Sequence, residues 1–153
     1  MMSKEQSVGF LRRALVGRLG MSLNDMPYVV PLHHIYHGNK IYFHCSCQGS
    51  KVEHFTKNPN VCYEVDEFLG IRKARNACDY GTRFRSVVAF GKVRLIVEPK
   101  RKLQILRKLM RKYADSSTYV QLNEETVEHV CVAEITIQEI SGKQDIGLAP
   151  TST

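Results

Sequence analysis

The first twenty residues follow a helical pattern of apolar positions. Four apolar residues recur at intervals of three or four positions, namely Val8, Leu11, Leu15 and Leu19. This spacing gathers side chains on one face of a helix. Ser3 and Gln6 form a capping-box pair at the start, and Gly20 is well placed to end the helix. The pattern therefore predicts an amphipathic helix over residues 4–19.

From Pro27 onward the pattern changes to that of strands. Residues 28–36 and 40–47 are rich in β-branched and aromatic side chains, which favour extended structure. Gly38-Asn39 lies between the two segments and suits a two-residue hairpin turn. These segments are therefore expected to pair as a β-hairpin.

Three further segments continue the strand pattern. Residues 60–68 alternate apolar and polar side chains, residues 83–97 form the longest strand pattern, and residues 130–140 form the last. Gly91 inside the longest segment indicates a bulge. The segment 69–82 has little periodicity and is expected to be a long connection, which often carries function or a partner contact.

A second amphipathic helix is predicted from Pro99 to Tyr113, because proline suits the first helical turn. Its buried stripe is expected to consist of Leu103, Leu106, Met110 and Tyr113. Residues 123–128 indicate one further helical turn, and the tail from Asp145 is expected to be loose. Five substantial strands with short helices between them favour a closed antiparallel barrel, mainly β with flanking helices, as a single domain over residues 1–153.

The composition is that of a soluble globular domain, with 43% hydrophobic and 24% charged residues. No apolar run approaches the roughly 20 residues that span a bilayer. Charged residues lie where a signal peptide needs an apolar core, at Lys4, Glu5, Arg12 and Arg13. The chain contains five cysteines, an odd number: Cys45, Cys47, Cys62, Cys78 and Cys131. We therefore expect free thiols and a cytoplasmic protein without membrane contact.

The net charge of +7 is unevenly distributed. Residues 83–112 carry eleven Lys and Arg against the single Glu98, whereas residues 115–145 carry seven acids against the single Lys143. A basic block of this kind can attract nucleic acid or a phosphorylated small molecule. No aromatic side chains are interleaved to stack bases, so a solvated helix face is the favoured interpretation and nucleic-acid binding the disfavoured one.

Common catalytic and nucleotide-binding motifs are missing. The sequence contains no P-loop, no G-x-G-x-x-G and no G-x-S-x-G. Histidines are frequent, but residues four apart on a strand are about 13 Å apart, so His33 and His37 cannot bind one ion. No C-x-x-C pair is present, and no metal site is predicted.

One segment does predict an anion site. A strand runs through Gly49 into a short helix, where Ser50 and Glu53 form a second capping-box pair and Asn58-Pro59 ends the helix. Amides at a helix start bind phosphate groups, and the ammonium of Lys51 adds charge. Glycine lets the backbone come close to a ligand.

Several short motifs occur in an order and spacing that cover residues 5–143. They are Pro27-Tyr28-Val29-Val30-Pro31, Ile41-Tyr42-Phe43-His44, Gly49-x-Lys51, Asn58-Pro59-x-Val61, Ala77-Cys78, Arg85-Ser86-Val87-Val88-x-Phe90-Gly91 and Ile140-Ser141-Gly142-Lys143. Together they resemble the FMN-binding split barrels of the pyridoxamine-5′-phosphate-oxidase superfamily, closest to the nitroimidazole-reductase-like branch. The resemblance implies a Greek-key-like split barrel.

The resemblance also implies a site. Backbone amides of the first hairpin strand, at Val30, Pro31, Leu32 and His33, would lie along the flavin ring. The strand end would line the cofactor with His44, Cys45 and Ser46, and Gly49, Ser50 and Lys51 would hold the FMN phosphate. Ser86 and Val87 would approach the flavin from the other side, and Arg85 would add charge to the phosphate. The family binds its flavin at a two-fold interface, which implies a homodimer.

The leading functional hypothesis is an FMN-dependent reductase of a small molecule, with FAD as the alternative cofactor and NAD(P)H as a possible donor. His44 is the candidate catalytic residue, because imidazole titrates near neutrality; its alternative role is a structural hydrogen bond. A second hypothesis is a non-catalytic flavin-binding or storage protein. A third is haem binding, for which His33, His34, His44 or His129 could serve as the axial ligand.

Overall fold

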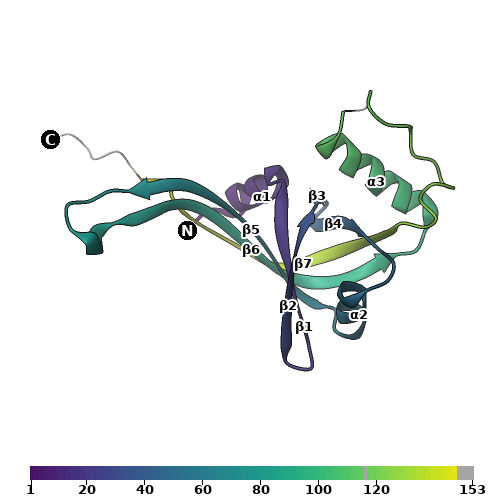
Figure 1. The fold of residues 1–153 in the computed structure, drawn as a ribbon, viewed down its shortest axis with the longest axis horizontal. Coiled ribbons are helices and arrows are strands. Elements are labelled where there is room, and N and C mark those ends of the chain that lie inside the picture. Colours follow the sequence, from purple (N-terminus) through teal and green to yellow (C-terminus); the bar gives the residue numbers. More distant parts are fainter. Residues whose placement is uncertain (116, 148–153) are drawn as a thin grey trace.

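The computed structural model describes residues 1–115 and 117–147 as one seven-stranded antiparallel sheet with helices around it (Figure 1). The strand order is β2-β1-β5-β6-β7-β4-β3. The elements are α1 (Lys4–Arg13), β1 (Val16–Leu23), β2 (Met26–His33), β3 (Ile35–His37), β4 (Lys40–Cys45), α2 (Ser50–Lys57), β5 (Asn60–Arg72), β6 (Gly81–Ile96), α3 (Pro99–Tyr113) and β7 (Cys131–Asp145). The expected mainly-β, antiparallel, split-barrel-like architecture is confirmed.

The first helix is shorter than the sequence pattern predicts. The Ser3–Gln6 capping box forms, but α1 ends at Arg13, and the expected helix over 14–19 is wrong because β1 starts at Val16. β1 pairs along its whole length with β2 across a turn at Asn24 and Asp25, both with positive φ. A turn of this kind matches the twist of paired strands, and eight paired residues outweigh a weak helical periodicity that contains two glycines.

The expected strand 28–36 is broken into two edge strands. β2 ends at His33, β3 begins at Ile35, and these strands form the opposite edges of the sheet. The sheet therefore closes on itself through the chain at His34, whose side chain is fully buried. The predicted hairpin turn at Gly38-Asn39 is confirmed, since both residues have positive φ and β3 pairs with β4 on either side.

The expected long connection over 69–82 is largely strand. β5 continues to Arg72 and β6 begins at Gly81, so the two strands leave the body of the molecule together as a hairpin arm (Figure 1). Both faces of a projecting arm are exposed, which removes the apolar alternation that marks a half-buried strand. The predicted bulge at Gly91 is confirmed by the register shift after Phe90; a Cβ there would lie 2.2 Å from the Thr136 carbonyl oxygen.

Two apolar clusters stabilise the fold. One fills the barrel, with Leu19, Phe43, Tyr63 and Ile135 fully buried. The other lies outside it, where α3 packs against β4 and β7 through Leu103, Ile105, Leu106 and Leu109. The predicted helix bounds are confirmed, although Met110 and Tyr113 are only half-buried.

The last part of the chain departs modestly from expectation. Residues 124–129 form consecutive turns rather than a helix, and β7 continues to Asp145. Most of the tail expected to be loose, residues 148–153, lies outside the described residues. Among the described helices, none combines the length and apolar character that a bilayer span requires.

Candidate functional site

The edge strand β2 presents two different faces. Tyr28, Val30 and Leu32 lean inward against the core, while the alternate residues Pro31 and His33 are exposed on the outer face. Because β2 is an edge strand, one row of its backbone groups is not paired with β1 and can meet a ligand. Val30 can therefore contribute to an external site only through its backbone.

An open groove of about 350 Å³ lies on the outer face where β2 meets β4. It brings together four of the residues expected from the sequence, Pro31, Leu32, His33 and His44. It also contains Val16, which the sequence pattern assigned to a helix. The turn signal at Asn24-Asp25 could have revealed β1, and with it the place of Val16.

The turn that enters α2 is open. Gly49 is the N-cap residue with φ 112°, and among the described residues no side chain caps the helix. The expected capping box of Ser50 and Glu53 is therefore wrong: Ser50 is the first helical residue, and Glu53 instead pairs with Lys57 at 2.7 Å. The absence of a side-chain cap leaves the amides of the first turn available to an external anion.

Lys51 connects this helix start to the groove. Its positive charge lowers the pKa of His44, after the larger effect of partial desolvation and the contribution of His33. Burial raises the pKa of the Cys45 thiol, and Lys51 opposes that rise. Within the described part of the chain, Lys51 itself makes no ion pair. An unpaired ammonium thus acts on the strand end, and its charge adds to desolvation in disfavouring the protonated form of His44.

The strand end and turn are fastened by a disulfide. Cys47 is bonded to Cys131 at the start of β7, with Cα atoms 5.1 Å apart, so the expectation of five free thiols is wrong for this pair. Cys45, Cys62 and Cys78 are free. The Cys45 side chain points into the core, whereas His44 and Ser46 are exposed, so only the latter two can present side chains to an external ligand.

The three residues expected on β6 are not part of the groove in this chain. Val87 is buried in the core, and Arg85 bonds to Glu67 and Gln144, each at 3.3 Å. Ser86 lies opposite Asp66 of β5. Three strand spacings separate β6 from β2, about 14 Å in a sheet, so the groove and Ser86 are distinct regions of one outer face.

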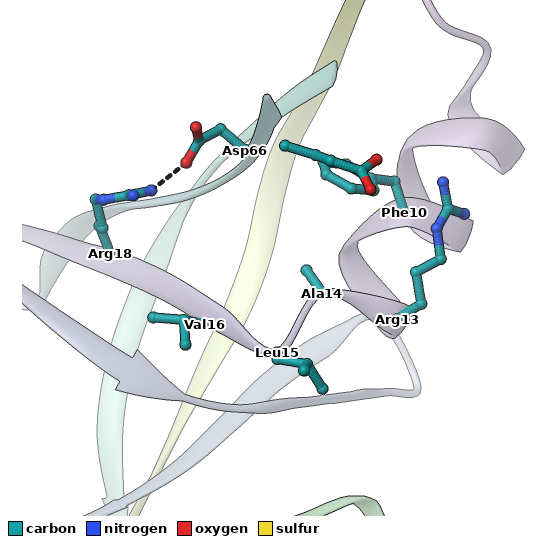
Figure 2. A pocket seen from close by; sticks show the side chains of 8 residues that line it. Phe10, Arg13, Ala14, Leu15, Val16, Arg18 and Asp66 are labelled. Carbon is teal, nitrogen blue, oxygen red and sulfur yellow. Dashed lines mark hydrogen bonds and ion pairs between the residues drawn. The ribbon is translucent and has the colours of Figure 1, made fainter. Parts of the chain in front are cut away.

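Figure 2 shows a second cleft, which the sequence pattern did not predict. It has a volume of about 400 Å³ and shares Val16 with the groove. Arg18 points across it to the carboxylate of Asp66, and also pairs with Glu64 at 2.9 Å. Its guanidinium is therefore already neutralised by two acids.

A third cavity, of about 360 Å³, is also lined by His33 and His44. Its remaining lining comes from α3 and from residues 122–130, including Leu109, Met110 and Val127. Because the groove and this cavity share both histidines, the two hollows are neighbours. Among the described residues, no group of three or more His, Cys, Asp or Glu could hold a metal ion.

Solved structures share this fold. A protein associated with 5-nitroimidazole antibiotic resistance from Bacteroides thetaiotaomicron VPI-5482 has 26% identity and a TM-score of 0.78, over 93% of this chain and 84% of that one. The flavocytochrome Anf3 from Azotobacter vinelandii has 25% identity and a TM-score of 0.84, over 96% and 69%. An FAD-binding protein from Mesorhizobium loti has 25% identity and a TM-score of 0.68, over 92% and 94%.

Sequence comparison gives the family. An uncharacterised protein, RA0666, of Rhizobium meliloti (strain 1021) is 32% identical over 72 residues, so the chain spans about half (47%) of the length of this curated relative. The family model of pyridoxamine 5'-phosphate oxidase matches residues 3–144, nearly the whole chain. The groove, the open helix start and the antiparallel sheet thus occur in a chain that belongs to the pyridoxamine 5'-phosphate oxidase family.

Proposed function

We propose that this chain is a flavin-binding oxidoreductase that holds FMN on the outer face and reduces a small molecule. The observation that carries the proposal is the uncapped start of α2 at Gly49, together with the unpaired Lys51, whose charge acts on His44 in the groove lining. A phosphate group matches both the free amides and the ammonium. The FAD-binding and flavocytochrome relatives support a flavin, with FAD as the alternative to FMN.

Each part of the site has a task in this proposal. Gly49, Ser50 and Lys51 bind the phosphate, the free edge of β2 at Pro31–His33 orients the ring, and Ser46 lines the cofactor. A bound flavin supplies the electron-transfer chemistry, while the protein orients it and tunes its environment. Desolvation lowers the pKa of His44, and an imidazole beside the groove could take a proton from solvent and pass it to the reduced substrate.

We further propose that the protein is a homodimer that completes the site. Apolar side chains are exposed on the outer face at Val29 and Phe90, and on the arm at Phe68, Ile71 and Tyr80. Exposed apolar surface of this kind marks interaction sites. A second copy packed on this face would bring its own Arg85 and Ser86 toward the groove, and Val87, whose side chain is buried in the core, would take part only through its backbone.

Haem binding is a second candidate, since an apolar cavity lies beside two accessible histidines and one relative is a flavocytochrome. His34 does not suit this role, because it is fully buried and its Nε2 bonds to the Leu11 carbonyl oxygen at 2.9 Å. A flavin storage protein without turnover is the third candidate.

One preparation separates these functions. The purified protein is expected to show a two-band flavin spectrum, with FMN identified by the mass of the released cofactor, and to bleach anaerobically with NADH or NADPH. FAD in the released fraction would correct the cofactor, and a strong Soret band would favour haem. Flavin that no donor reduces would favour storage, and a colourless protein that takes up no flavin would refute the proposal.

The cytoplasmic location is also a prediction. Disulfides are rare in the reducing cytosol, so the Cys47–Cys131 bond is the feature that tests it. Differential alkylation of rapidly quenched cells should find both thiols reduced if the protein acts in the cytoplasm, and bonded if it acts in an oxidising compartment.

A further inference from the structure

The cavity next to His33 and His44 is lined mainly by apolar side chains. α3 contributes Leu106, Leu109 and Met110, and the segment after the helix contributes Leu122 and Val127. None of its eleven lining residues, all within the described chain, is Asp, Glu, Lys or Arg. Its volume of about 360 Å³ lies within the range of small-molecule sites.

The hydroxyl groups in the lining are already engaged. The Tyr113 hydroxyl lies 2.7 Å from the Leu15 carbonyl oxygen and accepts a bond from the His34 amide at 2.9 Å. The Thr126 hydroxyl donates to the Asn123 carbonyl oxygen at 3.0 Å and accepts from the Asn123 amide. A ligand in the cavity would therefore find polar partners mainly in the two imidazoles.

His33 and His44 line both the cavity and the groove. The His33 ring stacks on Tyr113, with centroids 4.6 Å apart and an angle of 24° between the planes, and Tyr113 is held by its own hydrogen bonds. His33 is therefore held in place by its contact with Tyr113, and desolvation lowers the pKa of His44. A ring bound in the cavity would contact both histidines and lie next to the groove.

We propose that this cavity binds the aromatic ring of an uncharged substrate, a class that the family match does not assign. The inference rests on the proposed function, because it makes the cavity the substrate side of a flavin site in the groove. Burying an ionised group here would cost several kcal/mol, whereas an apolar ring gains from leaving water. The histidines would offer hydrogen bonds to a polar substituent at the edge of the ring.

A matched pair of ligands tests the proposal on the flavin-loaded protein. Naphthol is an uncharged bicyclic ring at neutral pH, and naphthalenesulfonate carries the same ring with a fixed negative charge. Isothermal titration calorimetry is expected to detect naphthol binding at least about tenfold tighter than naphthalenesulfonate binding, because the charged group would be desolvated without a partner.

Matched variants locate the binding. Leu122→Arg places a charge in the lining, whereas Val120→Arg places it in the same segment at a side chain that is 91% exposed. Leu122→Arg should weaken naphthol binding at least about tenfold and Val120→Arg should leave it unchanged. Met110→Trp fills the cavity without adding charge and should also weaken naphthol binding at least about tenfold. It replaces Leu122→Arg in the experiment if that variant does not fold.

The same samples distinguish the two proposals. Flavin retention, read from the absorbance near the flavin bands, reports the proposed function and is expected to be unchanged in all three variants. If wild-type protein retains flavin but binds neither ligand, or binds both equally, the substrate proposal for the cavity is overturned and the proposed function stands. Undiminished naphthol binding by Leu122→Arg or Met110→Trp would have the same consequence. Wild-type protein without flavin affinity would overturn the proposed function and the cavity's role with it.

Discussion

The helices α2 and α3 use their positive charges in opposite ways. Four basic residues of α3 donate to the protein's own carboxylate or carbonyl oxygens, namely Arg101, Lys102, Arg107 and Lys112. In α2, Lys57 pairs with Glu53, while Lys51 makes no ion pair among the described residues. These four cations thus stabilise the fold itself. The interpretation of α3 as a solvated face is wrong for buried Lys102 and for half-buried Arg101 and Lys112, whereas Arg107 is exposed.

The two helices are also anchored differently. α2 is held by buried Phe55 and by the disulfide that fixes the turn before it, so its N-terminus and Lys51 need no internal partners. α3 is held by its apolar stripe and by its own cations. The comparison teaches that a cation indicates a ligand site when the fold leaves it unpaired, and that the density of charge along the sequence does not.

Breaking the disulfide should have the largest effect on stability. Cys131→Ser opens the loop closed across a sequence separation of 84 residues, and the chain-entropy model gives a loss of about 4.5 kcal/mol in the free energy of unfolding. Guanidinium denaturation should show this loss in the variant and in reduced wild type alike. Cys62→Ser, at a free cysteine, is the control. Equal stability of Cys131→Ser and wild type would show that the turn is held by other means.

Removing the carboxylate that anchors the start of α3 comes next. Glu134 is fully buried and accepts from Lys40 at 2.9 Å, from Arg94 at 2.6 Å and from Arg101. Glu134→Gln should lower stability by about 2–3 kcal/mol, because charge-assisted hydrogen bonds are lost while the cations remain. Flavin affinity should be unchanged in the folded fraction. Glu139→Gln, on an exposed position of the same strand, should alter neither property.

Acid should loosen the other end of α3, where Lys112 and Tyr113 bond to the backbone of His34. Burial lowers the pKa of His34 from 6.5 to about 4. Between these values the unfolded chain binds a proton that the folded chain does not, so stability falls as the pH falls from 6.5 to 4 and is fully present above 6.5. The loss approaches about 3 kcal/mol.

Denaturation at pH 7 and pH 4 measures this effect. His34→Gln keeps a donor for the Leu11 carbonyl oxygen and should remove most of the pH dependence that His34 causes, whereas His37→Gln, on an exposed strand end, should preserve it. An unchanged pH profile in His34→Gln would assign the acid sensitivity to other groups.

The parts of the site that could be predicted from sequence are local. The turn at Gly49, the helix start at Ser50 and the cation at Lys51 lie within three residues, so short-range signals suffice to place them together. The groove residues on β2 and β4 followed from the family resemblance. The same locality explains the failure at residues 14–19, where pairing with β2 decided the conformation against a local helical period.

The parts that could not be predicted depend on distant segments. The disulfide joins residues 84 positions apart, and the apolar cavity requires α3 and residues 122–130 to pack beside two histidines from β2 and β4. In the sequence, the apolar residues of α3 indicate only a buried stripe. A buried stripe and a cavity wall have the same periodicity, so only the packed structure distinguishes them.

The central claim is that the turn Gly49–Lys51 holds the phosphate of the cofactor. The most direct measurement compares the affinities of FMN and riboflavin, which differ by that phosphate, in wild type, Lys51→Ala and Lys57→Ala. Wild type and Lys57→Ala should bind FMN far more tightly than riboflavin. Lys51→Ala should weaken FMN binding by about 1.5–3 kcal/mol and leave riboflavin binding unchanged. Equal affinities for the two flavins in wild type, or the same loss for both in Lys51→Ala, would contradict the account.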